Sequence, residues 1–194
     1  MHPLALLVLL SQARTVSAFH AIAIETTADV DVTIGATTKV EVSGPDDWVG
    51  KLETTVDKGT LHIRLPKDVK GKTPTFKVAI TMPALDAVAV SGISNVHVGK
   101  LATAKLALAV DGAATLDIAG TVESLALAVS GAAQFKLAGL DAQEAAVQVS
   151  GLASGAIKVD RSLAVALSGT ATLDLYGKPQ VIKQVSGTLE LRSR

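Results

Sequence analysis

Leu106-Ala107-Leu108-Ala109-Val110-Asp111-Gly112 has near-copies at 125–131 and 163–169, and these stretches carry the clearest signal of the fold. In each of them, large and small apolar residues alternate. A period of two is the spacing of a β-strand, whereas a helix would show a period of about 3.6 residues. Alanine and leucine favour helices by intrinsic propensity, but the alternation and the closing glycine favour strands. These stretches therefore predict β-strands that end at a glycine turn.

Outward from these stretches, the turn recurs through the second half of the chain. Its glycine returns every 18 to 20 residues, and serine or aspartate precedes it, at Ser91-Gly92, Asp111-Gly112, Ser130-Gly131, Ser150-Gly151, Ser168-Gly169 and Ser186-Gly187. We interpret the glycine as a residue with positive φ and the serine or aspartate as a side chain that bonds a nearby backbone N–H. A hairpin array would need turns every ~8–12 residues. The longer, fixed repeat instead predicts coils that stack ~4.8 Å apart.

We accordingly predict an all-β fold, a single-stranded right-handed parallel β-helix, which is a three-sided solenoid with 18–20 residues per coil. Residues 85–194 form its regular repeats. Residues 19–84 read as irregular first coils of the same domain, because the terminal repeats of a solenoid are atypical. Within them, Val56–Leu61 predicts a tight hairpin turn with Gly59 in the left-handed region.

Residues 1–18 are predicted to be a signal peptide. The apolar run Leu4–Leu10 precedes Val16-Ser17-Ala18, whose small residues suit cleavage before Phe19. The n-region carries no lysine or arginine, so a first strand or an unprocessed tail is the alternative. The run is shorter than the ~20 residues of a spanning helix, and no later stretch predicts a transmembrane segment. We therefore expect an exported protein that is periplasmic, outer-membrane-associated or secreted.

Composition excludes several function classes. The formal net charge is zero, which does not favour nucleic-acid binding. The chain has no cysteine, so disulfides and cysteine-based zinc sites are excluded. Hydrophobic residues make up 48% of the chain but aromatic residues only 3%, which indicates a core of small, regular aliphatic side chains. We predict no cofactor and no metal site.

A short apolar–polar–apolar triplet follows each turn, and its polar member should face solvent. These polar residues form a predicted outward column: His97, Asp117, Lys136, Lys158, Asp174 and Glu190. Together with Trp48, which lies in a predicted loop, the column is our candidate surface-binding face. Trp48 could stack on a sugar or cover one end of the solenoid.

A catalytic role for this column is not expected. Asp117 and Asp174 lie three predicted coils apart, or roughly 14 Å by strand spacing. Paired carboxylates in glycoside hydrolases lie ~5–9.5 Å apart. We therefore predict no catalytic residues and no enzyme, and interpret the column as a solvated face or a ligand-binding face.

The mature sequence resembles the auto-transporter adhesin "head GIN" family (DUF2807). The resemblance is carried by Phe19–Ile22, Asp29–Gly35, Gly59–Ile63, Met82–Leu85, Val90-Ser91-Gly92-Ile93 and Val129-Ser130-Gly131-Ala132. It implies an exported right-handed β-helix of the kind found in Gram-negative bacteria. The family name implies adhesion, and no catalytic residues are established for the family. The sequence ends at Arg194 without room for a translocating domain, so a direct autotransporter role is not expected.

Together, these features predict a non-enzymatic exported module of the envelope or cell surface, structural or adhesive, with a protein or glycan partner. Solenoid ends and faces could also support a homo-oligomer. The alternative is a protein that binds or cleaves polysaccharides, since many β-helices do so, although fold alone does not imply that activity.

Overall fold

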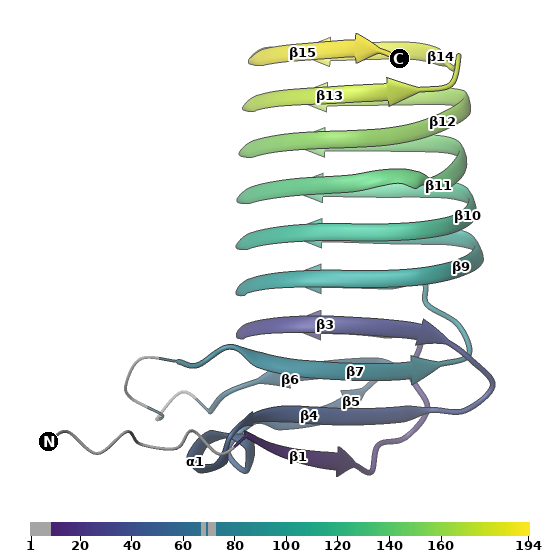
Figure 1. Cartoon of the computed structure of the whole chain (residues 1–194). Helices are drawn as coiled ribbons and strands as arrows, with labels where there is room; N and C mark the ends of the chain where they lie inside the picture. Colours follow the sequence, from purple (N-terminus) through teal and green to yellow (C-terminus); the bar gives the residue numbers. More distant parts are fainter. Residues whose placement is uncertain (1–8, 67–68, 70–72) are drawn as a thin grey trace, which may run out of the picture.

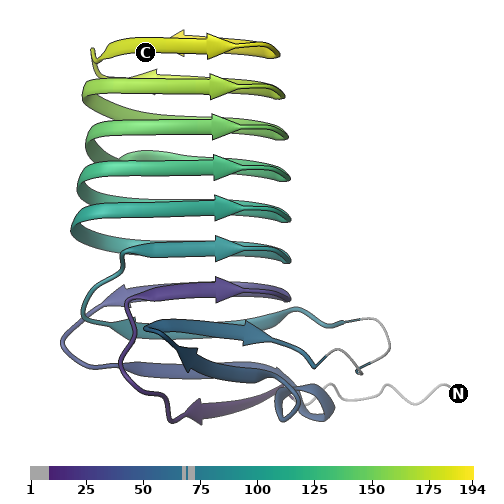
Figure 2. The same cartoon turned by 180° about the vertical axis from the view of Figure 1, so that it is seen from behind.

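The computed structural model describes residues 9–66, 69 and 73–194. It is an all-β solenoid of about five turns with a mixed sheet. The coils stack from the N-terminal end to the C-terminal end of the molecule (Figures 1 and 2). Four long strands each make most of one coil: β9 (Ile93–Val110), β10 (Ala113–Val129), β11 (Ala132–Val149) and β12 (Leu152–Leu167). Three shorter strands complete the stack: β13 (Thr170–Tyr176), β14 (Gln180–Val185) and β15 (Thr188–Ser193).

Neighbouring coils pair in parallel, as the repeat predicts. In β10, the residues paired with β9 fall into three stretches, 113–118, 120–122 and 124–129. Side chains alternate between buried and exposed in the first and third stretches; Leu116 and Leu127, for example, are 1% and 3% exposed. Every coil therefore contributes a layer of small aliphatic side chains to one continuous core.

The turn glycines serve a different purpose from the one predicted. Positive φ occurs at Gly59, Gly120, Gly155 and Gly177, and not at the Ser/Asp–Gly turns. At those turns, a Cβ would strike the coil below: one on Gly112 would lie 2.0 Å from the Gly92 carbonyl oxygen. The positive-φ interpretation is wrong for these turns, because close stacking of backbone, not left-handed geometry, demands glycine there. At Ser186, moreover, the hydroxyl donates to the Leu167 carbonyl oxygen (3.3 Å), whereas the prediction had it accept from a backbone N–H.

The first coils are not wholly parallel. Strand β2 (Ala21–Ile24) pairs in parallel with β8 (Ala87–Val90), and β8 and β3 (Thr27–Ile34) each pair in parallel with β9. By contrast, β4 (Lys39–Pro45) is antiparallel to both β1 (Leu9–Arg14) and β7 (Phe76–Met82). Strands β5 (Glu53–Asp57) and β6 (Thr60–Arg64) form an antiparallel hairpin. The prediction of a purely parallel helix is therefore wrong here, whereas the hairpin turn is confirmed, with Gly59 at φ 78°.

The predicted signal peptide lies partly outside the described residues, which begin at residue 9. Within it, β1 is held to the first coils by a hydrogen bond from the Arg14 guanidinium to the Val49 carbonyl oxygen (2.6 Å). Cleavage before Phe19 stays a prediction. Among the described residues, no helix has both the length and the apolar character to span a membrane.

Candidate functional site

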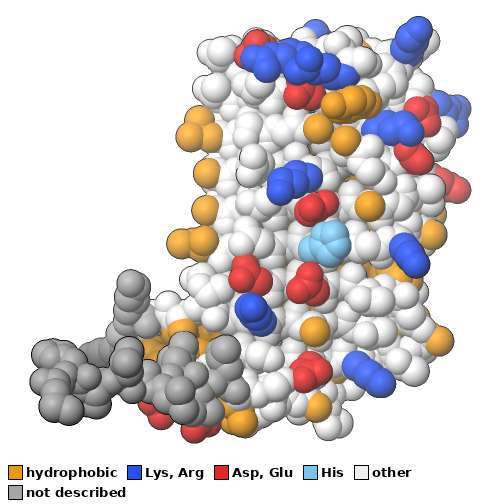
Figure 3. Space-filling model, in the orientation of Figure 1, with side chains coloured by type: hydrophobic (Ala, Val, Ile, Leu, Met, Phe, Trp, Pro, Cys, Tyr) orange, Lys and Arg blue, Asp and Glu red, His pale blue; other side chains and the backbone are white. Residues whose placement is uncertain are grey.

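The candidate face is formed by the first stretch of each coil, where outward side chains stack in columns along the solenoid. From β3 to β15, strand register places seven residues in the column that contains His97: Asp31, His97, Asp117, Lys136, Ala156, Asp174 and Arg192. The four predicted members His97, Asp117, Lys136 and Asp174 are thus brought into one line. We call the set of seven residues the charged column. Figure 3 shows charged side chains following one another along this face.

Two predicted members do not belong to the charged column. Lys158 pairs in register with Asp141 and Tyr176, and its expected place is taken by Ala156. Glu190 lies opposite Thr172, two residues before Arg192. Lys158 and Glu190 were assigned to the column because the apolar–polar–apolar triplets were aligned by their polar residue. From His97 onward, column members follow the turn glycine by five residues, as Asp117 follows Gly112, and counting from that glycine would have found Ala156 and Arg192.

The side chains of the charged column are solvated and partly paired with opposite charges. His97 Nδ1 lies 3.8 Å from Asp117 Oδ2, and their side chains are 57% and 45% exposed. Arg194 Nε donates to Asp174 Oδ1 across 3.1 Å. Exposed pairs of this kind contribute ~0–1 kcal/mol each, so the charged column presents charge to solvent and adds little to stability.

Lys158 lies in another stretch of its coil, where its Nζ is 2.5 Å from Asp141 Oδ1. The hydrogen bond to Asp141, followed by the negative charge of that carboxylate, raises the pKa of Lys158 above its ordinary value. Lys158 is therefore held by a partner in the adjacent coil and is not aimed at the candidate face.

Trp48 lies apart from the charged column. It belongs to the short helix α1 (Asp46–Val49), not to a loop as predicted, and α1 packs on β1 and β4 at the N-terminal end of the stack (Figure 1). The indole is half-buried against the core, and Lys51 Nζ lies 5.2 Å from its ring centroid. This position suits the alternative that Trp48 covers one end of the solenoid.

A shallow hollow of about 360 Å³ adjoins His97 and is lined in part by Asp29, Asp31, Asn95 and Asp117. Asn95 Nδ2 donates to Asp29 Oδ1 across 2.7 Å. In the described parts of the chain, no group of three or more histidine or acidic side chains is arranged to hold a metal ion. The hollow therefore offers exposed hydrogen-bonding groups without a metal-binding geometry.

A larger groove, which was not predicted from the sequence, lies beside the charged column. It has a volume of about 540 Å³ and crosses five coils. One wall is a ridge of mainly apolar residues: Ile93, Ala113, Ala132, Leu152 and Thr170. The other wall is a ladder of uncharged polar residues: Asn95, Thr115, Gln134, Ser154 and Thr172. Residues one and three positions after each turn glycine form these walls, so the repeat itself carried the signal.

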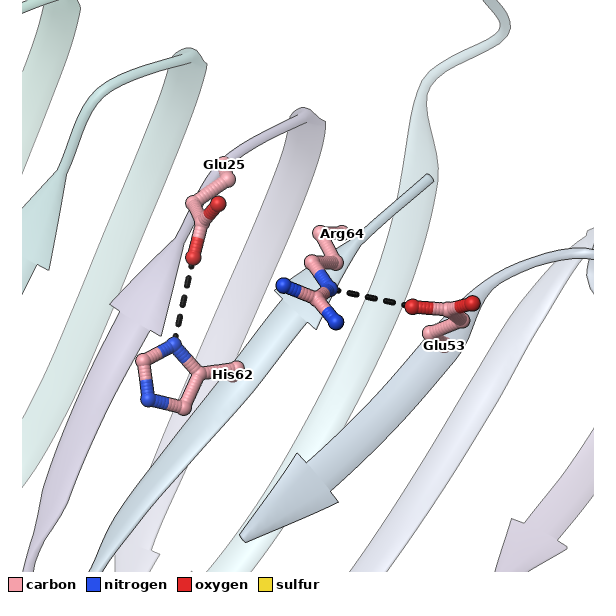
Figure 4. Close-up of polar contacts among 4 residues, drawn as sticks. All are labelled: Glu25, Glu53, His62 and Arg64. Atoms are coloured by element: carbon pink, nitrogen blue, oxygen red, sulfur yellow. Dashed lines mark hydrogen bonds and ion pairs between the residues drawn. The ribbon is translucent and has the colours of Figure 1, made fainter. Parts of the chain in front are cut away.

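The first coils carry polar contacts of a different kind. His62 Nδ1 lies 3.1 Å from Glu25 Oε1, and Arg64 Nε donates to Glu53 Oε2 across 3.0 Å (Figure 4). The second pair joins the two strands of the β5–β6 hairpin, and the first joins that hairpin to the end of β2. These contacts tie the hairpin to the stack, and their residues contribute nothing to the face that carries the charged column.

These features define a β-solenoid whose outward residues repeat once per coil. Residues 18–179 match the family described as "Putative auto-transporter adhesin, head GIN domain" (DUF2807), and the chain belongs to this family. A search of curated proteins gives no match.

Several solved bacterial structures have a similar fold. A putative adhesin from Bacteroides fragilis is 21% identical, with a TM-score of 0.75 over 96% of this chain and 97% of that chain. Putative adhesins from Parabacteroides merdae and Parabacteroides distasonis are each 16% identical with TM-scores of 0.52; each covers 96% of this chain, and 96% and 97% of their own chains are covered. At these identities, the likeness supports the fold alone.

Proposed function

We propose that this protein is an exported, non-enzymatic module of the bacterial envelope or cell surface that acts by adhesion, with a protein or glycan of the envelope as its partner. The observation that carries the proposal is the candidate face, where outward residues recur once per coil across the stack. A repeated surface of this kind suits the binding of extended or repeating partners. Membership of an adhesin-type family supports the same function.

Adhesion is tested with the purified mature protein on immobilised envelope fractions and on intact bacterial cells. We expect saturable binding that a charge change within the candidate face, Lys136→Glu, weakens. The matched control is Lys105→Glu, an exposed lysine in the third stretch of its coil. Equal binding by both variants would place the adhesive surface elsewhere, and no saturable binding by the wild-type protein would overturn the proposal.

The alternative is a polysaccharide-cleaving enzyme. Lys136 and Ala156 separate Asp117 from Asp174 in the charged column, so these carboxylates do not approach the ~5–9.5 Å of glycoside hydrolases. A panel of acidic polysaccharides is incubated with the protein and assayed for new reducing ends, which hydrolysis and elimination both produce, and for new unsaturated ends, which only elimination produces. We expect no product, and robust turnover would favour the enzyme.

Export, winding and self-association complete the proposal. We infer that signal peptidase cuts before Phe19, and N-terminal sequencing of the exported protein tests that site.

We further infer right-handed winding around three sides, supported by the three paired stretches of each coil and by the preference for right-handed crossovers between parallel strands. Solenoid ends or faces would provide the contacts of a homo-oligomer.

A further inference from the structure

We propose that the groove beside the charged column binds an uncharged, extended polysaccharide chain that lies parallel to the solenoid axis. This inference rests on the proposed adhesive function and gives it a ligand class and a site. We call the site the axial groove. Its ridge is Ile93, Ala113, Ala132, Leu152 and Thr170, and its ladder is Asn95, Thr115, Gln134, Ser154 and Thr172.

The walls of the axial groove present two kinds of surface. Ile93 and Leu152 on the ridge are 64% and 61% exposed, which is unusual for large aliphatic residues in this chain. The ladder side chains carry only hydroxyl and amide groups, and most of these can both donate and accept hydrogen bonds. A sugar ring has the same dual character, with hydroxyl groups at its rim and C–H groups on its faces. The two walls can therefore satisfy both parts of such a ring.

The absence of charge among the described lining residues favours a neutral polymer over a charged one. None of the described residues that line the axial groove is charged, although 36 of the 194 residues of the chain are Lys, Arg, Asp or Glu. An acidic glycan or a strongly charged peptide would lose hydration there without gaining an opposite charge from these lining residues. A neutral chain loses no such hydration.

The distance between adjacent coils favours a glycan over a peptide as the bound chain. Equivalent residues on adjacent coils lie ~4.8 Å apart, which is close to the length that one pyranose ring adds to an extended glycan. A peptide strand advances ~3.3 Å per residue and would fall out of step with the coils. The groove strands β9–β12 are also paired on both sides, so they have no free edge for an added strand. Five coils thus correspond to about five sugar rings.

The test uses defined neutral oligosaccharides of the cello-, manno- and xylo-series, two to eight rings long, with oligogalacturonate and extended neutral peptides as comparisons. Binding is screened on arrays and measured by calorimetry. We expect at least one neutral series to bind, with affinity rising until about five rings and then levelling off, because the axial groove spans five coils. Failure of every neutral series, or preferential binding of the peptides or the acidic glycan, would overturn the inference.

Matched variants locate the site. Gln134→Ala removes an amide from the ladder, and Ala132→Lys introduces bulk and charge on the ridge. Their controls, Gln148→Ala and Ala128→Lys, make the same changes at exposed positions in the third stretch of the coil. We expect the groove variants to bind at least tenfold more weakly, or about one decade in Kd, and the controls to match the wild type. Equal affinities for groove and control variants would place the ligand elsewhere.

Parallel adhesion assays keep the two proposals separable. Adhesion to envelope fractions without binding of any neutral glycan overturns the axial-groove assignment and leaves the adhesive function standing. Glycan binding lost in Gln134→Ala, without adhesion by the wild-type protein, supports the axial groove and overturns the adhesive function. Thermal melting of every variant confirms that the altered binding does not come from unfolding.

Discussion

Gly131 lies directly over Gly112, so that a Cβ on Gly131 would be 1.9 Å from the Gly112 carbonyl oxygen. The same relationship repeats upward, since a Cβ on Gly151 would lie 2.0 Å from the Gly131 carbonyl oxygen. Because that carbonyl also accepts the Leu152 N–H at 2.9 Å, it cannot move aside without loss of a hydrogen bond between coils. The turn glycines thus set how closely the coils stack.

Gly131→Ala should therefore be strongly destabilising. Overpacking commonly costs ~1–3 kcal/mol, and a clash with backbone should reach the upper part of that range or exceed it. Gly99→Ala is the control, because a Cβ there meets nothing within 4 Å. Urea unfolding measures both. If Gly131→Ala were as stable as Gly99→Ala, the stacked-backbone explanation of the turns would be wrong.

Leu173 and Asp174 test the inward and outward assignment of a single strand. Leu173 is 1% exposed in the core, so Leu173→Ala should cost ~2–5 kcal/mol. Asp174 faces solvent and pairs with Arg194 at 3.1 Å, so Asp174→Ala should change the free energy of unfolding by at most ~1 kcal/mol. Equilibrium urea melts at neutral pH compare the two, and a reversed order would contradict the assignment.

Lys158 and Asp141 should make stability sensitive to alkaline pH. The pKa of Lys158 is raised above its ordinary value of 10.5 in the folded protein, first by its hydrogen bond to Asp141 and then by the charge of Asp141. A raised folded-state pKa gives a stabilisation that is complete below the unfolded-state pKa and is lost as pH rises through the folded-state value. The contribution should therefore be constant at neutral pH and disappear above 10.5.

Asp141→Asn should remove this alkaline dependence. The variant keeps the shape of the side chain but removes the charge that raises the pKa of Lys158. Melting temperatures measured from pH 8 to pH 11.5 should fall less steeply at the alkaline end for the variant than for the wild type. Parallel curves for the two proteins would show that the pair is not formed in solution.

Lys183 should limit self-association at the C-terminal end of the described stack. It pairs in register with the buried Val165 and so occupies an inward position, while neighbouring Val181 and Val185 are 36% and 42% exposed. An inward-pointing charge protects an open strand edge against pairing with another chain. We expect Lys183→Val to increase dimer or higher oligomer content in sedimentation velocity. Glu190→Val, at an outward position of β15, is the comparison; equal association by both variants would argue against a specific role for Lys183.

Part of the candidate face could be predicted because the repeat is local. The alternation in Leu125–Val129 and the recurring turn glycine identify strands, coil length and buried positions without knowledge of neighbouring coils. His97, Asp117 and Lys136 were aligned for the same reason, and their register confirms it. Lys158 was wrongly assigned to the column because of Gly155. This glycine occupies the position of Phe135 and Leu173 in adjacent coils, so the apolar–polar–apolar triplet of that coil is hard to recognise.

The strand period, the coil length and the aliphatic core follow from the amino-acid sequence alone, because each depends on residues within one repeat. The need for glycine at the turns, the membership of each column and the course of the axial groove emerge only in the folded molecule, because each depends on backbone from adjacent coils meeting in a particular register. The antiparallel pairing of β4 with β1 and β7 also appears only in the folded molecule. Alternation along one strand fixes which of its side chains are buried but not the direction of its neighbour.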